Sequence, residues 1–400
     1  MQDLIQKAHA SNPRIEVHAW FAMMPVWNQS TPPKDPNHVF NLHGPGKTGR
    51  DLWLSKNFAG SFTGDGNSEY VIDPGHPDAA DYTINVLKHV AAHYDVDGIH
   101  MDLIRYMGTD WGYNPTSVDR FNQRYGRTGL PDPNDETWKA WRREQVNHLV
   151  EKAYANLLAV KPNLVVSAAT IAWGNGPKTI DEYKASLTMN SALQDWNRWL
   201  ETGAIDLAIP MNYFREYDPT QKQYYENWLA WEKDHQYKRR ISAGVGLYLN
   251  SIPDGLTQIR KARQPSVSGN KLAGVHLYSY AVTNKDGVPN SEFYAALSEP
   301  SPYDNQTPVL AEQVAPPVLP WKAQPITGHL TGKVLYSNGT ISDNETVTIR
   351  GPESRTVQTD GSGDYSAIDL KPGTYTITCG KISKTVSITA GKVTQANLTD

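Results

Sequence analysis

Cysteine is almost absent from this chain of 400 residues, because Cys379 is the only one. An intrachain disulfide is therefore excluded, and thiol content does not indicate a redox compartment. Long hydrophobic runs are lacking as well, since no segment approaches the roughly 20 apolar residues of a membrane-spanning helix. The opening MQDLIQKAHA has neither the basic start nor the apolar stretch of a signal peptide. With 38 basic against 42 acidic residues, excess positive charge is also missing, so we expect no nucleic-acid partner.

Aromatic residues are plentiful but unevenly chosen, with 12 Trp and 21 Tyr beside only 7 Phe. Trp and Tyr combine a flat apolar face with a polar edge, and such rings stack on sugar rings. Large barrel cores also need bulky aromatics, so composition leaves both interpretations open.

From residue 14 onward, short apolar runs alternate with amphipathic helical stretches, which is typical of parallel β/α units. Helical spacing of apolar residues predicts helices over 78–93, 137–160 and 221–234. The predicted strands are Ile15–Phe21, Gly98–Leu103, Leu164–Thr170, Ile205–Tyr213, Ile241–Leu249 and Leu272–Tyr280. We therefore expect an α/β fold, a TIM-type (β/α) barrel over residues 1–298.

The number of strands falls short of the eight that a closed barrel requires. The first unit begins with a helix over 3–10 instead of a strand. The sequence thus predicts that the first two β/α units are lacking, which leaves six parallel strands. An incomplete barrel closed by another segment or by a second chain is the alternative, because an open edge promotes aggregation.

A change in composition marks the end of this region. Residues 299–326 hold seven of the 27 prolines and predict a semi-rigid linker between separable domains. From 327 to 400, short alternating strands (GKVLY, TVTIR, TYTIT, TVSIT) predict a small all-β sandwich. Through TDGSGDY at 359–365 and DLKPGTY at 369–375, this tail resembles the carboxypeptidase regulatory-like (prealbumin-like) modules.

The turn in that tail has the start of a calcium-loop pattern at Asp360, Ser362 and Asp364. The bidentate glutamate that would complete such a loop is missing. A plain hairpin turn is therefore the expectation.

The segment 94–106 carries the clearest chemical signal. His100 and Asp102 share parity on an apolar strand, and a buried polar side chain is costly unless it is used. Asp102 falls at the carboxyl end of the strand, which is the catalytic face of a parallel barrel. A buried ion pair between Asp102 and Arg105 is the structural alternative.

These residues also carry a family resemblance. The run DGIHMD at 97–102 followed by IRY at 104–106 resembles the motif D-G-I-x-x-D-x-I-R-F of glycosyl-hydrolase-like family 10 barrels. VHAWF at 17–21, DPG at 73–75 and PMNY at 210–213 resemble further motifs of that family in the same order. The resemblance spans about residues 3–295 and implies a (β/α)8-barrel glycoside hydrolase with Asp102 at the end of barrel strand four.

A more distant resemblance reaches poly-glucosamine exopolysaccharide hydrolases and family 18 chitinases. The catalytic Glu of the chitinase pattern would fall at Ile104, so a mechanism through that Glu is excluded. The resemblance implies a substrate that includes amino sugars.

Glycoside hydrolysis normally needs a second carboxyl group. Glu216 is the leading candidate, since it follows the strand that ends near Tyr213, and Asp218, Asp110 and Asp73 are others. A solvated loop charge is the alternative for Glu216. If none qualifies, an N-acetyl or amine substituent of the sugar could assist.

Other polar and aromatic residues near strand ends are expected to bind substrate, although core packing would explain each of them as well. They are His18, Trp20, His100, Arg105, Tyr106, Trp173, Asn212, Tyr213, Tyr248, His276 and Tyr278. Histidines on separate strands, with no H-x-x-x-H pair, argue against a metal site, and we expect no cofactor.

The sequence thus predicts a glycoside hydrolase that cleaves O-glycosidic bonds in a bacterial or environmental polysaccharide. Polysaccharides rich in amino sugars are among the expected substrates. We expect it to be secreted or at the cell surface, with the C-terminal module available for surface association. A catalytically silent glycan-binding barrel and a cell-surface structural protein are the alternatives.

Overall fold

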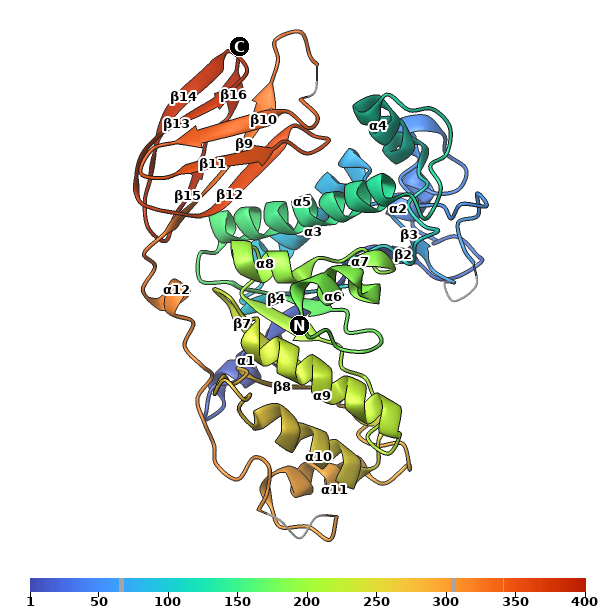
Figure 1. The fold of residues 1–400 in the computed structure, drawn as a ribbon, viewed down its shortest axis with the longest axis vertical. Coiled ribbons are helices and arrows are strands. Elements are labelled where there is room, and N and C mark those ends of the chain that lie inside the picture. Colours follow the sequence, from blue (N-terminus) through green and yellow to red (C-terminus); the bar gives the residue numbers. More distant parts are fainter. Residues whose placement is uncertain (65–67, 304–306, 341) are drawn as a thin grey trace.

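The computed structural model describes residues 1–64, 68–303, 307–340 and 342–400. Residues 304–306 of the predicted linker lie outside them. Its N-terminal region is built on one curled sheet of six parallel strands in the order β1-β4-β5-β6-β7-β8 (Figure 1). These strands are β1 (His18–Ala22), β4 (Gly98–Asp102), β5 (Val165–Thr170), β6 (Leu207–Pro210), β7 (Arg240–Gly246) and β8 (Gly274–Tyr278). The six parallel strands that the sequence predicts are therefore present.

The sheet is open instead of closed into a barrel. Within the described residues, β1 pairs only with β4, and β8 pairs only with β7. Parallel barrels close with eight strands, so the sheet of this chain is a half-barrel. Its two edge strands are less buried than the central β5 and β7, which follows from the lack of a neighbour on one side.

Helices follow the strands and cover the outer face of the curled sheet (Figure 1). The helices of the half-barrel are α1 (Gln2–Ala10), α2 (Val39–His43), α3 (Pro77–His93), α4 (Pro115–Tyr125), α5 (Glu136–Val160), α6 (Ile180–Ala185), α7 (Leu187–Asn190), α8 (Trp196–Thr202), α9 (Pro219–Asp234), α10 (Ile252–Arg263) and α11 (Asn290–Ser298). A short hairpin, β2 (Pro25–Trp27) with β3 (Tyr70–Val71), lies in the long connection after β1.

Two helices show why the chain becomes helical where it does. The carboxylate of Asp135 accepts hydrogen bonds from the backbone N–H groups of Thr137 and Trp138, which caps the start of α5. Asp218 caps α9 in the same way, with proline at the first helical position. Trp138 and Trp141 of α5 are both buried and pack against Phe121 of α4, which fixes the long helix to α4.

The C-terminal region is a sandwich of two small sheets. One has the order β11-β10-β13-β14, and the other has β12-β9-β15 with β16 also paired to β9. Its strands are β9 (Gly328–Leu335), β10 (Thr346–Arg350), β11 (Ser354–Gln358), β12 (Asp364–Leu370), β13 (Gly373–Cys379), β14 (Ile382–Ile388), β15 (Val393–Gln395) and β16 (Leu398–Thr399). The module has its own core, which includes Leu330, Val347 and Tyr375.

Contacts tie this sandwich to the half-barrel, while the separability of the tail stays a prediction. Ile368 of the sandwich is buried in the core of the half-barrel. Lys152 of α5 lies at a junction of three carboxylates, two from the sandwich (Asp360 at 2.9 Å and Asp364 at 2.5 Å) and one from α3 (Asp81). The turn that has the start of a calcium-loop pattern therefore contacts the ammonium group of Lys152.

The connection between the two regions is anchored as well. It contains the one-turn helix α12 (Pro320–Ala323), and the indole of Trp321 donates a hydrogen bond of 2.7 Å to Asp206. Lys322 forms an ion pair with the same carboxylate at 3.1 Å. Asp206 is fully buried and directly precedes β6 in the chain. The prolines keep this segment extended, and the contacts of Trp321 and Lys322 hold it against the half-barrel.

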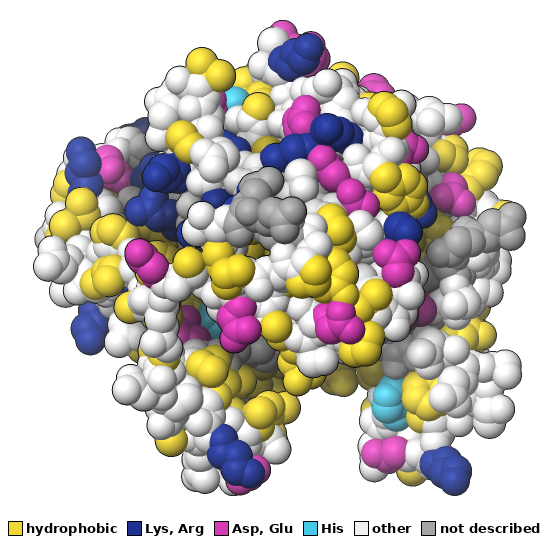
Figure 2. All heavy atoms as spheres, turned by 90° about the horizontal axis from the view of Figure 1, so that it is seen from below, with side chains coloured by type: hydrophobic (Ala, Val, Ile, Leu, Met, Phe, Trp, Pro, Cys, Tyr) yellow, Lys and Arg dark blue, Asp and Glu magenta, His cyan; other side chains and the backbone are white. Residues whose placement is uncertain are grey.

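The view from the α10–α11 end shows acidic and basic side chains interspersed with hydrophobic ones on that face (Figure 2). None of the helices that the structure describes combines the length and the apolar character needed to span a membrane.

Candidate active site

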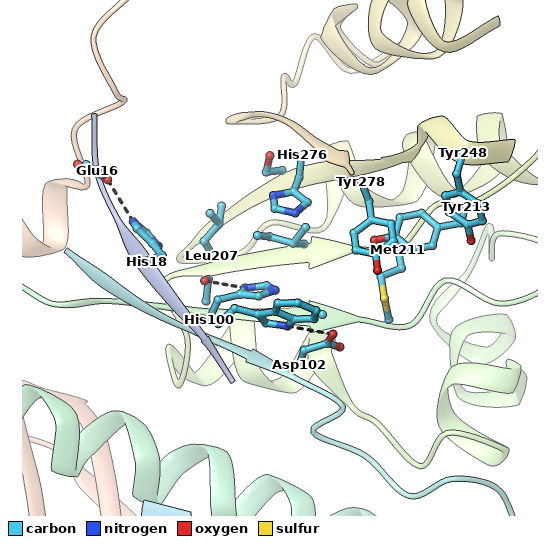
Figure 3. A pocket seen from close by; sticks show the side chains of 15 residues that line it. Glu16, His18, His100, Asp102, Leu207, Met211, Tyr213, Tyr248, His276 and Tyr278 are labelled. Atoms are coloured by element: carbon cyan, nitrogen blue, oxygen red, sulfur yellow. Dashed lines mark hydrogen bonds and ion pairs between the residues drawn. The ribbon is translucent and has the colours of Figure 1, made fainter. Parts of the chain in front are cut away.

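A pocket of about 620 Å³ opens on the concave face of the half-barrel (Figure 3). The side chains that line it come from all six strands and from the segments next to them. The lining residues are Glu16, His18, Trp20, His100, Asp102, Ser167, Ala169, Leu207, Ile209, Met211, Tyr213, Ser242, Tyr248, His276 and Tyr278. Seven of the expected substrate-binding residues, together with Asp102, are among them.

Asp102 is held in place at the last position of β4. Its Oδ2 accepts a hydrogen bond of 3.1 Å from the indole N–H of Trp20, which lies on the neighbouring β1. Its Oδ1 accepts one of 2.6 Å from the backbone N–H of Leu103. Leu103 has a φ of 52°, a left-handed conformation that costs a non-glycine residue about 1 kcal/mol or more. The backbone of the turn after β4 is thus strained, and this turn fixes the orientation of the Asp102 carboxylate.

Three histidines line the wall next to Asp102. The ring of His100 lies within 3.0 Å of the Ser167 hydroxyl and stacks at 6.0 Å on the ring of His276. Burial, together with the proximity of His276 and His18, lowers the pKa of His100 to about 3. Burial also lowers the pKa of His276. His100 and His276 are therefore neutral at physiological pH and can both donate and accept hydrogen bonds.

Tyrosine rings form the opposite wall. Tyr213 stacks on Tyr278 at 5.4 Å, and the ring of Tyr248 meets both of them edge-on at 6.0 Å. Burial raises the pKa of the Tyr213 hydroxyl, and the charge of Asp102 adds to the effect. The Tyr213 hydroxyl therefore stays protonated, and the faces of the three rings offer a flat apolar surface to a planar or ring-shaped ligand.

Glu16 is the second carboxylate of the pocket, and our sequence interpretation missed it. It pairs with the ring of His18 at 3.3 Å. Asp102 is level with Ala22 in the sheet, and Glu16 precedes Ala22 by six residues, which corresponds to about 20 Å of fully extended chain. Glu16, His18 and Trp20 have the same parity, and that alternation was the signal that could have identified Glu16.

Glu216 does not line this pocket. Its carboxylate accepts a hydrogen bond from Lys261, lies 3.8 Å from Lys222 and is only 8% exposed. The backbone N–H of Glu216 donates to the side chain of Asn250. The side chain that led our search for a second carboxylate therefore sits in a buried ion pair behind the loop after β6.

Two other candidates for the second carboxylate have structural positions. Asp73 is completely buried and accepts hydrogen bonds from Gly75, Ser117 and Tyr106. Burial raises its pKa. Tyr106, which we expected to bind substrate, thus points its hydroxyl at Asp73 and is only 2% exposed. Asp218 caps α9, and neither Asp218 nor Asp110 lines the pocket.

Asn212, another expected substrate contact, is fully buried as well. Its side-chain amide donates a hydrogen bond of 3.0 Å to Glu232 of α9, and one oxygen of Glu232 has no hydrogen-bond partner. Burial raises the pKa of Glu232 to about 8. The pair sits beneath the turn that carries Tyr213, so it positions the aromatic wall without contacting a ligand.

We expect Glu232→Gln to remove part of the pH dependence of folding stability. The folded-state pKa of about 8 exceeds the ordinary value of 4.5. The native protein should therefore lose stability as the pH rises from 4.5 to 8, by up to a few kcal/mol at about 1.4 kcal/mol per pKa unit. Urea unfolding of both proteins at pH 5, 7 and 8.5 measures this. Parallel curves for the two proteins would show that Glu232 is not protonated in the folded state.

Arg105 and Trp173 form a pair outside the pocket lining, on the segments that follow β4 and β5. The guanidinium lies 5.1 Å from the centre of the indole ring. Trp173 is 36% exposed, and Arg105 is half-buried. The ion pair between Asp102 and Arg105, our structural alternative for this segment, is not formed, although the charge of Asp102 acts on Arg105.

The residues of this pocket do not match the geometry of a metal centre. Within the described part of the chain, no three His, Cys, Asp or Glu side chains are grouped so that they could hold a metal ion. The arrangement instead combines one well-oriented carboxylate, neutral hydrogen-bonding rings and flat aromatic walls, which suits a polyhydroxylated ring compound.

Comparison with known proteins assigns a family. The model of the family described as glycosyl hydrolase-like 10 matches residues 1–262. This chain belongs to the glycosyl hydrolase-like 10 family. The match covers the strands from β1 to β7 and every residue that orients Asp102, which confirms the family that the sequence motifs resemble.

Two curated relatives from the comparison are bacterial glycosyl hydrolases. Glycosyl hydrolase YngK of Bacillus subtilis (strain 168) is 27% identical over 215 residues, which cover 53% of this chain and 38% of the relative. Glycosyl hydrolase DigH of Escherichia coli (strain K12) is 25% identical over 234 residues, which cover 54% of this chain and 46% of the relative. The matches thus span less than half the length of these relatives.

Among solved structures, the glycoside hydrolase domain of PgaB (BpsB) from Bordetella bronchiseptica aligns with a TM-score of 0.46 at 13% identity. The alignment covers 70% of this chain and 74% of that domain.

Proposed function

We propose that this family member is a glycoside hydrolase that cleaves O-glycosidic bonds in a polysaccharide, with Asp102 as the proton-transferring group. The position of Asp102 carries this proposal: a carboxylate oriented by Trp20 and Leu103 at the carboxyl end of a parallel strand, inside an aromatic pocket. Trp20, Tyr213 and Tyr278 offer faces on which sugar rings stack, and His100 and His276 offer neutral hydrogen-bonding groups for hydroxyls.

The pocket supports an amino sugar at the cleavage position. Retaining and inverting pairs of carboxyl groups lie about 5–10 Å apart, whereas about 20 Å of extended chain separates Glu16 from the level of Asp102. An acetamido oxygen of the substrate can supply the second group. Asp102 donates a proton to the glycosidic oxygen as the C1–O bond breaks, while the acetamido oxygen bonds to C1. Asp102 then takes a proton from the water that attacks C1, and the bond between C1 and the acetamido oxygen breaks to restore the acetamido group.

Among the described residues, Asp102 and Glu16 are the only carboxylates that line the pocket, which also favours one alternative, a barrel that binds glycan without cleaving it. Aromatic walls and neutral histidines would serve a binding site equally well. With either function, hydrolysis or glycan binding, we propose that the protein is secreted and that the sandwich associates with the cell surface. The resemblance of the sandwich to regulatory-like modules likewise stays a prediction.

A glycan panel separates the two functions. We expect incubation with chitin, partly deacetylated chitin, hyaluronan and cellulose to release oligosaccharides from at least one polymer that contains amino sugars, and none from cellulose. Mass spectrometry after reducing-end labelling identifies the products, and pull-down with the insoluble polymers measures binding. Retained binding without release from any polymer would replace hydrolysis by the glycan-binding alternative.

A further inference from the structure

The guanidinium of Arg105 has an unusual set of partners for a partly buried cation. Its Nη1 donates a hydrogen bond of 3.2 Å to the backbone carbonyl of the next residue, Tyr106, and lies 4.0 Å from the sulfur of Met107. Its Nε is buried and has no hydrogen-bond partner. No carboxylate of the described residues lies within ion-pair distance of it, although the charges of Asp102 and Glu69 act on it.

Other buried or partly buried arginines of this chain bond residues well separated in sequence, although the Nε atoms of Arg142 and Arg239 also lack a hydrogen-bond partner. Arg198 pairs with Glu144 at 2.6 Å and with Glu151 at 3.3 Å, and Arg239 pairs with Asp369 at 2.9 Å. Arg142 has no carboxylate but donates to three backbone carbonyls from distant segments. Each of these arginines holds segments of the protein together. Arg105 bonds only its own neighbours in sequence, so a role in the fold does not account for its donors.

The position of Arg105 links it to the pocket. It follows Asp102 by three residues, on the segment that leaves the carboxyl end of β4. Its guanidinium lies over the indole of Trp173, which follows β5 at the same end of the sheet and is 36% exposed. A cation over an exposed aromatic ring, next to a sugar-sized pocket, can place one sugar ring and one negative charge together.

We propose that Arg105 and Trp173 form a subsite that binds the carboxylate of an acidic sugar next to the cleavage position. A guanidinium carries its charge at any physiological pH and matches a carboxylate with two parallel N–H donors. Trp173 supports the ring of the same sugar. The inference rests on the proposed glycan function and narrows its substrate to a polymer that joins amino sugars with carboxylate-bearing sugars.

The test measures binding with a matched pair of probes. One is a hyaluronan octasaccharide, in which glucuronate alternates with N-acetylglucosamine, and the other is the same compound with its carboxylates reduced to alcohols. Isothermal titration should show at least ~10-fold tighter binding of the acidic form, since a hydrogen bond to a charged group contributes about 1.5–3 kcal/mol. Arg105→Gln should abolish this preference and leave affinity for the reduced form unchanged.

Two further variants make the result specific to Arg105. Arg105→Lys keeps the charge but loses the paired donors, so it should retain only part of the preference. Arg124 lies over the ring of Tyr125 at 5.3 Å on the exposed side of α4 and makes the same cation–ring contact far from the pocket. Arg124→Gln should therefore bind both probes like the native protein.

The outcomes separate this inference from the proposed function. Equal affinity of the native protein for both probes, or a loss of both in Arg105→Gln, would overturn the carboxylate subsite and leave glycan binding in place. If the native protein binds neither probe and no polymer of the panel, the glycan function fails and the subsite fails with it. Unchanged thermal unfolding of Arg105→Gln confirms that the variant is folded.

Discussion

Asp102→Asn should lower the turnover of the natural glycan at least ~100-fold, which is the lower end of what a positioned proton-transfer group contributes. Asparagine keeps the size of the side chain and can still contact Trp20, so the affinity for substrate and the unfolding temperature should change little. Release of reducing ends by native and variant protein measures the effect. Asp110→Asn is the matched control, because Asp110 is an exposed carboxylate that does not line the pocket.

A substrate with an activated leaving group then tests which role Asp102 has. If Asp102 is the general acid, the variant should recover much of its lost rate, since a good leaving group departs without protonation. A nucleophilic Asp102 would leave the rate low with either leaving group. Near-normal turnover of the natural glycan by the variant would overturn the assignment of Asp102 altogether.

Lys152→Met should destabilise the whole chain by about 3–5 kcal/mol, because it leaves three carboxylates at the junction without their cation. The Lys152 side chain is only 8% exposed. Burial lowers its pKa, but the charges of Asp360, Asp364 and Asp81 outweigh this effect and raise it. Chemical denaturation measures the change in the free energy of unfolding. Lys7→Met is the control, since its ion pair with Asp3 is about three-quarters exposed and contributes little.

A compensating variant shows whether the charge imbalance is the cause. Replacing Asp81, Asp360 and Asp364 with asparagine in the Lys152→Met background should recover much of the lost stability, because no unpaired charge then stays buried. A truncated chain of residues 1–326 gives an independent reading. If it unfolds at the same denaturant concentration as the full chain, the junction contributes nothing and the tail is separable after all.

Local patterns were enough to predict the elements of the half-barrel. The apolar runs located all six strands, although β6 covers only residues 207–210 of the predicted 205–213. The position of the sandwich was beyond such reasoning. Lys152 and Asp360 are 208 residues apart in sequence, so no local pattern links them. The prolines between the two regions indicate an extended linker, but they do not show whether the two domains contact each other.

The site was predictable where strand parity decides which way a side chain points. Asp102, His100, His18 and Trp20 reach the pocket for that reason. Past the end of a strand, parity no longer applies, and proximity in sequence does not give direction. Tyr106 and Glu216 both follow a strand end closely, but buried partners on other segments, Asp73 and Lys261, turn their side chains away from the pocket.

The uneven exposure of tryptophan gives the molecule an optical readout of its own pocket. The Trp20 side chain is 62% exposed, whereas Trp138, Trp196, Trp199 and Trp228 are completely buried. A dissolved quencher such as acrylamide therefore reaches the indole that bonds Asp102 long before it reaches those in the core. A ligand that covers Trp20 would shield its fluorescence from the quencher, so occupancy of the pocket can be followed in the unlabelled protein, without knowledge of the reaction.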